Sequence, residues 1–121
     1  MNRYITTGII VLMAALLQAC VQPTRDVSVT FEVDVRNQTG VQQVSVRGGL
    51  APLSWQENAP LSDADGDSIY TGTFTFNIPY DSVPVKFVIN ENQFELDGKP
   101  NRMAPLQENE PALFRVVFDQ E

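Results

Sequence analysis

The sequence contains no histidine, one cysteine and one tryptophan among its 121 residues. Without histidine, a Ser-His-Asp triad and a His-containing zinc site are excluded. No serine lies in a G-x-S-x-G context either. Paired carboxylates are still available, but a small β-domain seldom forms the cleft that a glycosidase-like pair needs. We therefore predict that the protein is not an enzyme and needs no cofactor.

Basic residues are also scarce, with eight Lys and Arg against 15 Asp and Glu, which gives a formal net charge of −7. An acidic surface repels the phosphates of nucleic acids and gains little from anionic lipid headgroups. The charge balance thus argues against nucleic acid as a partner. Any attachment to a membrane has to come from another feature of the chain.

The N-terminal segment offers such a feature. Arg3 is followed by an apolar run from Gly8 to Leu17 and then by Leu17-Gln18-Ala19-Cys20. The run is shorter than the roughly 20 residues of a membrane-spanning helix, but it suits the hydrophobic region of a signal peptide. The tetrapeptide resembles the lipobox of bacterial lipoproteins, in which a diacylglyceryl-modified cysteine becomes the mature N-terminus. The alternative is an ordinary signal peptide with an incidental cysteine, but Cys20 has no second cysteine for an intramolecular disulfide.

This processing divides the chain into a cleaved signal peptide (1–19), a lipidated tether (20–26) and a folded domain (27–121). The 102 residues that remain after cleavage are enough for one modest core, and the loss of Arg3 leaves a charge of −8. Acyl chains on Cys20 would anchor the domain, since each buried methylene contributes about 0.8 kcal/mol. Val21 stands where an aspartate would favour inner-membrane retention under the enterobacterial sorting rule. We therefore expect a lipid-anchored envelope protein at the outer membrane of a Gram-negative bacterium.

Alternating apolar and polar residues predict strands through most of the mature chain. The strictest alternation runs from Val27 to Arg36. Further alternating segments follow Val44, Tyr70 and Val83, with shorter ones over 94–96 and 114–118. The side chains predicted to face inward are Val27, Val29, Phe31, Val33, Val35, Tyr70, Gly72, Phe74, Phe76, Ile78, Val83, Val85, Phe87, Ile89, Phe114, Val116 and Phe118. Since no ten-residue mature segment has helical periodicity, we predict an all-β fold, an antiparallel immunoglobulin-like β-sandwich of about seven short strands.

Three alternating aspartates, Asp63, Asp65 and Asp67, suggest a calcium loop, because alternate oxygens on a tight turn suit a hard cation. The EF-hand template fails at two points: the glycine expected after the third ligand is Ser68, and the glutamate expected at the twelfth position is Phe74. The three aspartates are therefore weak metal candidates. We predict a solvated turn between two strands instead.

Trp55 lies in a polar segment between Leu50 and Leu61 that contains two prolines and is predicted to be a loop or a short irregular strand. A lone tryptophan in a small β-protein usually belongs to the core. An indole held at a surface, however, can pack against the C–H face of a sugar ring while nearby polar groups bind its hydroxyls. Trp55 is thus a candidate carbohydrate-binding residue.

Several short features follow one another in order between about Val27 and Phe118. They are Gly48-Gly49, Leu53-Ser54-Trp55, Ala59-Pro60-Leu61, the Asp-Gly turn, the segments 69–74 and 85–88, Phe94-Glu95 and Pro100-Asn101-Arg102. This order resembles the starch-binding domain of carbohydrate-binding module family 20 and the related glycogen-binding β-sandwiches. The resemblance implies a starch-binding-like sandwich that binds an α-glucan, such as starch, glycogen or a maltooligosaccharide.

Matched position by position, the resemblance implies a sugar site made of Trp55, Lys86, Phe94, Glu95 and Asn101. The two aromatic rings would stack on successive glucose units, and the three polar side chains would bond the 2- and 3-hydroxyls. Phe94 stands where the family has tryptophan, and its alternation with Leu96 also allows it to be a core residue. The tyrosines of the family's second site have no counterparts here, so we expect at most one site.

The sequence thus predicts a membrane-anchored, non-catalytic lipoprotein that binds α-glucan. A separate glycoside hydrolase or an envelope protein is the expected protein partner. The alternative is an envelope structural or protein-interaction lipoprotein in which the sandwich persists and the sugar site has decayed.

Overall fold

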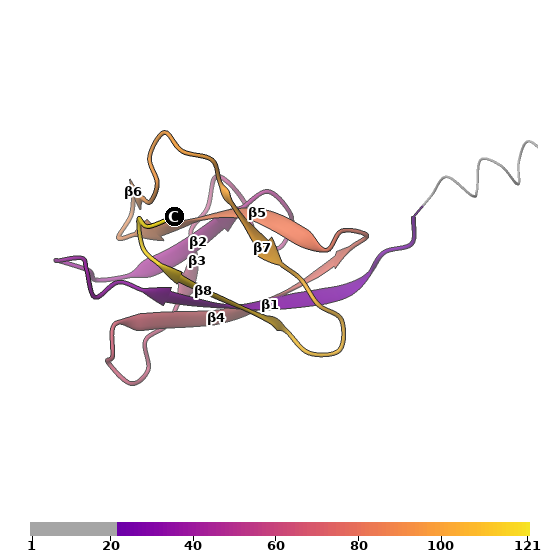
Figure 1. Cartoon of the computed structure of the whole chain (residues 1–121), viewed down its shortest axis with the longest axis horizontal. Coiled ribbons are helices and arrows are strands. Elements are labelled where there is room, and N and C mark those ends of the chain that lie inside the picture. The colour runs from indigo at the N-terminus through magenta and orange to yellow at the C-terminus, as the bar shows by residue number, and fades with distance from the viewer. Residues whose placement is uncertain (1–21) are drawn as a thin grey trace, which may run out of the picture.

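The computed structural model describes residues 22–121, so the predicted signal peptide and Cys20 lie outside the described residues. The described chain is all-β, as predicted, with eight strands in two sheets that enclose one core (Figure 1). Within residues 22–121, no helix has the length and hydropathy that crossing a membrane requires.

A three-stranded sheet has the order β4-β1-β8. β1 (Arg25–Asp34) pairs antiparallel with β4 (Ile69–Ile78) along its whole length and parallel with β8 (Ala112–Val117). The parallel pair is the one exception, among the described strands, to the antiparallel pairing that the sequence predicts. It arises because β8 reaches β1 after the chain has passed through the other sheet, and such a crossover does not impose the antiparallel direction of a hairpin.

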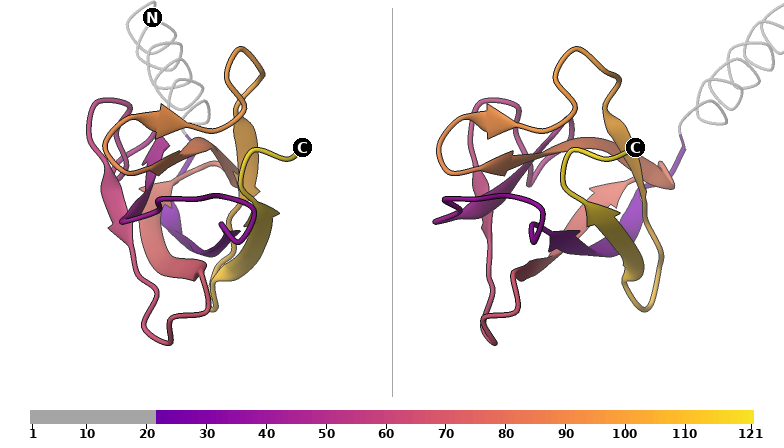
Figure 2. Two further views of the ribbon diagram at one scale, coloured as in Figure 1. Left: turned by 90° about the vertical axis from the view of Figure 1, so that its left-hand side faces the viewer. Right: turned by 60° about the vertical axis from the view of Figure 1, so that its left-hand side comes forward.

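The second sheet has five strands and is centred on β5 (Ser82–Ile89). On one side, β5 pairs with β2 (Val44–Gly48), which in turn pairs with β3 (Ala59–Leu61). On the other side, it pairs first with β7 (Arg102–Pro105) and farther along with β6 (Gln93–Phe94). In Figure 2 the two sheets face each other, with β2, β5 and β7 opposite β1, β4 and β8.

The core between the sheets contains most of the side chains that the alternation predicts to face inward, together with residues that it does not predict, such as Leu53, Leu61 and Leu106. In β1, Val27, Val29, Phe31 and Val33 are buried, whereas their neighbours Ser28, Thr30 and Glu32 are partly exposed. Phe31 lies at the centre, with ring centroids 5.7, 5.3 and 6.3 Å from those of Phe74, Phe87 and Phe114. Aromatic rings at such distances and tilted angles attract one another beyond the effect of burial alone.

Some boundaries differ from the predicted ones. β1 begins at Arg25, so two residues assigned to the tether belong to the sheet. The guanidinium of Arg25 forms ion pairs with Asp81 and Glu108 and donates to the carbonyl of Ile78 at 3.1 Å, which fixes the start of the strand. β7 is a strand that the alternation does not predict, because its sequence, Arg-Met-Ala-Pro, is too short to show a period.

Candidate functional site

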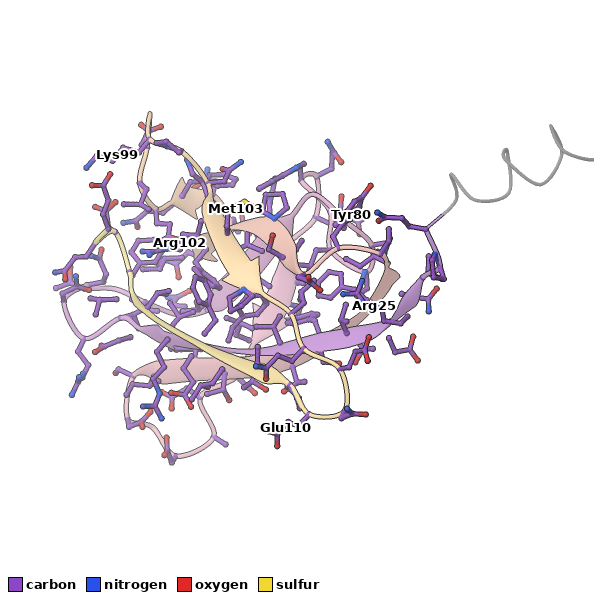
Figure 3. All side chains as sticks on the ribbon, turned by 45° about the vertical axis from the view of Figure 1, so that its right-hand side comes forward. Arg25, Tyr80, Lys99, Arg102, Met103 and Glu110 are labelled. Atoms are coloured by element: carbon purple, nitrogen blue, oxygen red, sulfur yellow. The ribbon has the colours of Figure 1, made fainter. Side chains whose placement is uncertain are left out.

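The outward surface of the five-stranded sheet brings together most of the predicted site. We call it the outer face and define it by Arg47 of β2, Lys86 and Val88 of β5, Phe94 of β6 and Met103 of β7. Cross-strand pairing places Lys86 opposite Arg47 and Val88 opposite Phe94. Directly opposed residues of an antiparallel pair project to the same side of a sheet. Figure 3 shows Met103 on β7, where it pairs with Pro84 of β5.

Arg47 links the two aromatic residues that the sequence proposes as platforms. Its Nη1 donates to the carbonyl oxygen of Trp55 at 2.6 Å, and its Nε donates to Oδ1 of Asn58 at 2.7 Å. The guanidinium carbon also lies 4.9 Å from the centroid of the Phe94 ring, within the range of a cation–π interaction. Arg47 therefore holds the loop that carries Trp55 and contacts Phe94 at the same time.

Phe94 is exposed, with 38% of its surface accessible, so it is not a core residue. Trp55 is partly buried. Val88, which the alternation places outward, is nevertheless inaccessible to solvent. Its neighbours explain this burial, because Phe94 lies opposite Val88 on one side and Arg47 reaches that ring from the other side. The outer face thus has a small apolar centre covered by an arginine and a phenylalanine.

Gly49 makes room for Trp55. A Cβ atom at this position would lie 3.3 Å from Nε1 of Trp55 and 3.0 Å from Cγ of Pro84. The amide of Gly49 donates to the carbonyl of Pro84 at 3.1 Å, so the backbone here cannot easily move away. The indole therefore lies against a backbone position where only glycine fits without displacing a neighbour.

We expect Gly49→Ala to shift the fluorescence of Trp55 and to destabilise the fold by about 1–3 kcal/mol, the usual cost of overpacking. Since Trp55 is the sole tryptophan of the chain, its emission reports directly on this contact. Gly66→Ala is the matched control. Gly66 has a φ of +72°, and a Cβ atom there would meet no heavy atom within 4 Å, so alanine should reduce stability but leave the emission maximum unchanged. Equal emission from both variants and the wild type would contradict the proposed packing.

Lys86 lies on the outer face, as the alternation predicts, but its amine is engaged with the backbone. Nζ donates to the carbonyl oxygens of Leu96 at 3.0 Å and Lys99 at 3.1 Å. These bonds hold the connection between β6 and β7 against β5. Asn101, which ends that connection, is exposed and directly precedes Arg102, the partner of Val85. Asn101 therefore lies one position beyond the paired residues of β7, next to Lys86 in the continued register.

Glu95 is not at the surface, which corrects its predicted role as a direct sugar ligand. Its accessible fraction is 0%, and its two oxygens accept from Nε and Nη2 of Arg102, both at 2.8 Å. They also accept the backbone amides of Phe87 at 3.1 Å and Asp119 at 3.2 Å. The physical reason lies in the strand itself: successive side chains point to opposite faces, so Phe94 and Glu95 cannot both face outward.

The three aspartates form the turn that the sequence predicts. Their closest carboxylate oxygens lie within 4.8 Å of one another, and each carboxylate accepts a backbone amide of the turn; for example, Asp63 accepts that of Ser68 at 2.9 Å. Partial desolvation raises the pKa of Asp63, but the Ser68 amide and the neighbouring groups outweigh it and lower this pKa overall. Hydrogen bonding to Asp67 raises the pKa of Asp65. These hydrogen bonds stabilise the turn, and this structural role explains why three aspartates lie so close together.

The outer face and the adjoining loop therefore bring an exposed ring, Phe94, and a partly buried ring, Trp55, close to amine, amide and guanidinium donors. This set is suited to stacking on a ring and bonding its substituents. Sequence reasoning brought Trp55, Lys86, Phe94 and Asn101 to this region, but it missed Arg47. The alternation of Val44 and Val46 could have identified Arg47, because the next residue along must face outward. In comparisons with known proteins, no family model matches the sequence, and no curated protein matches it.

Proposed function

We propose that this protein is a lipid-anchored, non-catalytic lipoprotein that binds a carbohydrate chain on the outer face. The observation that carries the proposal is Arg47 on the outer face, which bonds the backbone carbonyl of Trp55 and lies against the exposed ring of Phe94. The order of the sequence features resembles that of starch-binding β-sandwiches. This resemblance suggests an α-glucan as the ligand: starch, glycogen or maltooligosaccharides.

The chemistry of sugar binding fits the groups on this face. The C–H side of a pyranose packs on an aromatic ring, while its hydroxyls need donors and acceptors nearby. Asn101 is exposed and offers both. Lys86 has three N–H donors, of which two are engaged with carbonyls, so one remains for a hydroxyl. Glu95 supports this site from beneath by holding the chain that follows Phe94.

The proposed lipid anchor would determine where in the cell this binding takes place. We propose that Cys20 is lipidated and holds the domain at the outer membrane, where it would keep polysaccharide close to the cell or to a separate glycoside hydrolase. With no histidine in the chain and the single cysteine used for the lipid, the domain would retain its ligand rather than transform it. Metabolic labelling with a palmitate analogue tests the anchor, because Cys20→Ala should abolish incorporation.

A fluorescence titration tests the sugar site. Adding maltoheptaose to the full chain should quench or shift the emission of Trp55, and Trp55→Ala should abolish retention on immobilised amylose. The chain should be purified in a non-ionic detergent without a sugar headgroup, so that the detergent cannot occupy the site. Tyr80→Ala is the control, since Tyr80 is an exposed aromatic residue outside the outer face. An emission spectrum that stays constant up to millimolar maltoheptaose would refute α-glucan binding.

One observation favours the alternative of an envelope structural or protein-interaction lipoprotein. Two of the five residues matched to the sugar site, Lys86 and Glu95, are bonded to the protein's own backbone. In a decayed site these residues would persist for stability alone. The alternative predicts that Trp55→Ala has no effect on any saccharide and instead disrupts an envelope complex, which crosslinking in intact cells would detect.

A further inference from the structure

The basic residues of the described chain divide into two groups. Five of the seven basic residues in 22–121 form an ion pair with a carboxylate, and these are Arg25, Arg36, Lys99, Arg102 and Arg115. The remaining two, Arg47 and Lys86, form none with any residue of this part of the chain, although the sequence contains 15 acidic residues. In so acidic a protein, two cations without a carboxylate partner stand out.

These two cations are also directly opposite each other. Arg47 and Lys86 are cross-strand partners in the β2–β5 pair, and both project onto the outer face. Like charges at directly opposed positions destabilise a sheet. Here each cation bonds only neutral acceptors: carbonyl oxygens for Lys86, and a carbonyl and an amide oxygen for Arg47. No negative charge in the described chain neutralises the pair by direct contact.

Both side chains keep donors for a ligand. The guanidinium of Arg47 has five N–H groups, and only Nε and Nη1 donate to described residues, so Nη2 remains available. Lys86 retains one N–H. The Arg47 donors lie beside the exposed ring of Phe94 and the loop of Trp55, and Lys86 is the cross-strand partner of Arg47. An acidic group there would accept charge-assisted hydrogen bonds, which are roughly twice as strong as neutral ones.

From this arrangement we propose that the ligand of the outer face is an acidic saccharide, whose carboxylate or sulfate group binds between Arg47 and Lys86 while a sugar ring stacks on Phe94 or Trp55. The inference rests on the proposed sugar-binding function and narrows its ligand class. Nucleic acid also carries anionic groups, but a long run of phosphates would be repelled by the overall charge of the protein. A short acidic oligosaccharide carries only a few anionic groups, so the attraction of the local pair of Arg47 and Lys86 can exceed this repulsion.

The test compares three ligands by Trp55 fluorescence on the full chain in a non-ionic, sugar-free detergent: oligogalacturonate, sulfated maltoheptaose and neutral maltoheptaose. We expect at least one acidic ligand to bind roughly tenfold or more tightly than the neutral one at low salt. This advantage should shrink as sodium chloride rises from about 10 mM to 1 M. A preference for carboxylate or for sulfate identifies the source of the acidic group.

Variants assign the effect to the cation pair. Arg47→Met and Lys86→Met should each weaken binding of the acidic ligand by roughly tenfold or more. Arg36→Met removes the same charge from an arginine that is paired with Asp34 on the other sheet, and it should leave binding unchanged. Arg47→Lys keeps the charge but loses the planar fork, so it should bind with intermediate affinity and serves as the second variant if Arg47→Met does not fold.

The outcomes separate this inference from the proposed function. Equal or preferential binding of neutral maltoheptaose would overturn the acidic ligand and leave the sugar-binding function intact. Failure of all three ligands to bind would overturn both. Tighter binding of an acidic ligand that Arg36→Met weakens as much as Arg47→Met does would also overturn the inference, because the effect would then come from net charge alone.

Discussion

Glu95→Ala is expected to destabilise the domain by about 3–5 kcal/mol, the usual cost of removing one partner from a buried ion pair. The substitution leaves the Arg102 guanidinium facing the core and removes the acceptor for the amides of Phe87 and Asp119. For a domain of about 100 residues, this loss corresponds to a decrease in melting temperature of roughly 15–30 °C. Thermal unfolding followed by circular dichroism measures it.

Two further variants make this prediction specific. Glu110→Ala removes the same charge from an exposed loop residue (Figure 3) and should change stability by no more than about 0.5 kcal/mol. Glu95→Gln preserves the shape and one oxygen acceptor, so it should fall between the wild type and Glu95→Ala. If Glu95→Ala melts within a few degrees of the wild type, the ion pair does not hold β5, β6 and β7 together as described.

The centre of the core should be equally sensitive. Phe31→Ala is expected to destabilise the domain by about 3–5 kcal/mol, because it removes a fully buried ring that contacts three other rings. These three aromatic partners come from both sheets, since Phe87 belongs to β5 and Phe74 and Phe114 belong to β4 and β8. The cavity would therefore separate the two layers. Urea denaturation gives the free energy of unfolding directly.

Phe31→Leu is the informative companion of Phe31→Ala. Leucine fills much of the space and keeps the site apolar, so its loss of stability should be clearly smaller. Tyr80→Ala is the matched control for truncating an aromatic ring, since Tyr80 is 56% exposed and its removal should change stability by at most about 0.5 kcal/mol. Comparable losses from Phe31→Ala and Tyr80→Ala would contradict a core centred on Phe31.

Alternation alone is sufficient to predict most of the fold, because a half-buried strand imposes a period of two on its side chains. It correctly places Phe31 and Phe87 inside and Lys86 outside. It cannot predict the parallel pairing of β8 with β1, since direction is decided by connections between sheets rather than by periodicity. Nor does it predict β7, whose four residues are too few to show a period.

The candidate site shows a different limit. The resemblance places Glu95 at the surface as a sugar ligand, yet Glu95 is buried against Arg102, which also faces inward, opposite the buried residue Val85. A sequence does not reveal which two charges will meet inside a fold. The sequence does show that Phe94 and Glu95 cannot both face solvent, because consecutive residues of a strand point to opposite faces. The same alternation places Arg47 on the outer face, but only the structure shows that it contacts Trp55 and Phe94.

The position of β1 also has a mechanical consequence. This strand begins at Arg25, at the end of the domain nearest the predicted anchor, and it pairs with β4 at ten positions and with β8 at six. A pull on the N-terminus along the strand would load these hydrogen bonds together in shear, instead of peeling them apart one after another. The ion pairs of Arg25 with Asp81 and Glu108 would meet the force first. If the domain is anchored and binds a ligand as we propose, this topology would help it to remain folded while flow pulls on that ligand.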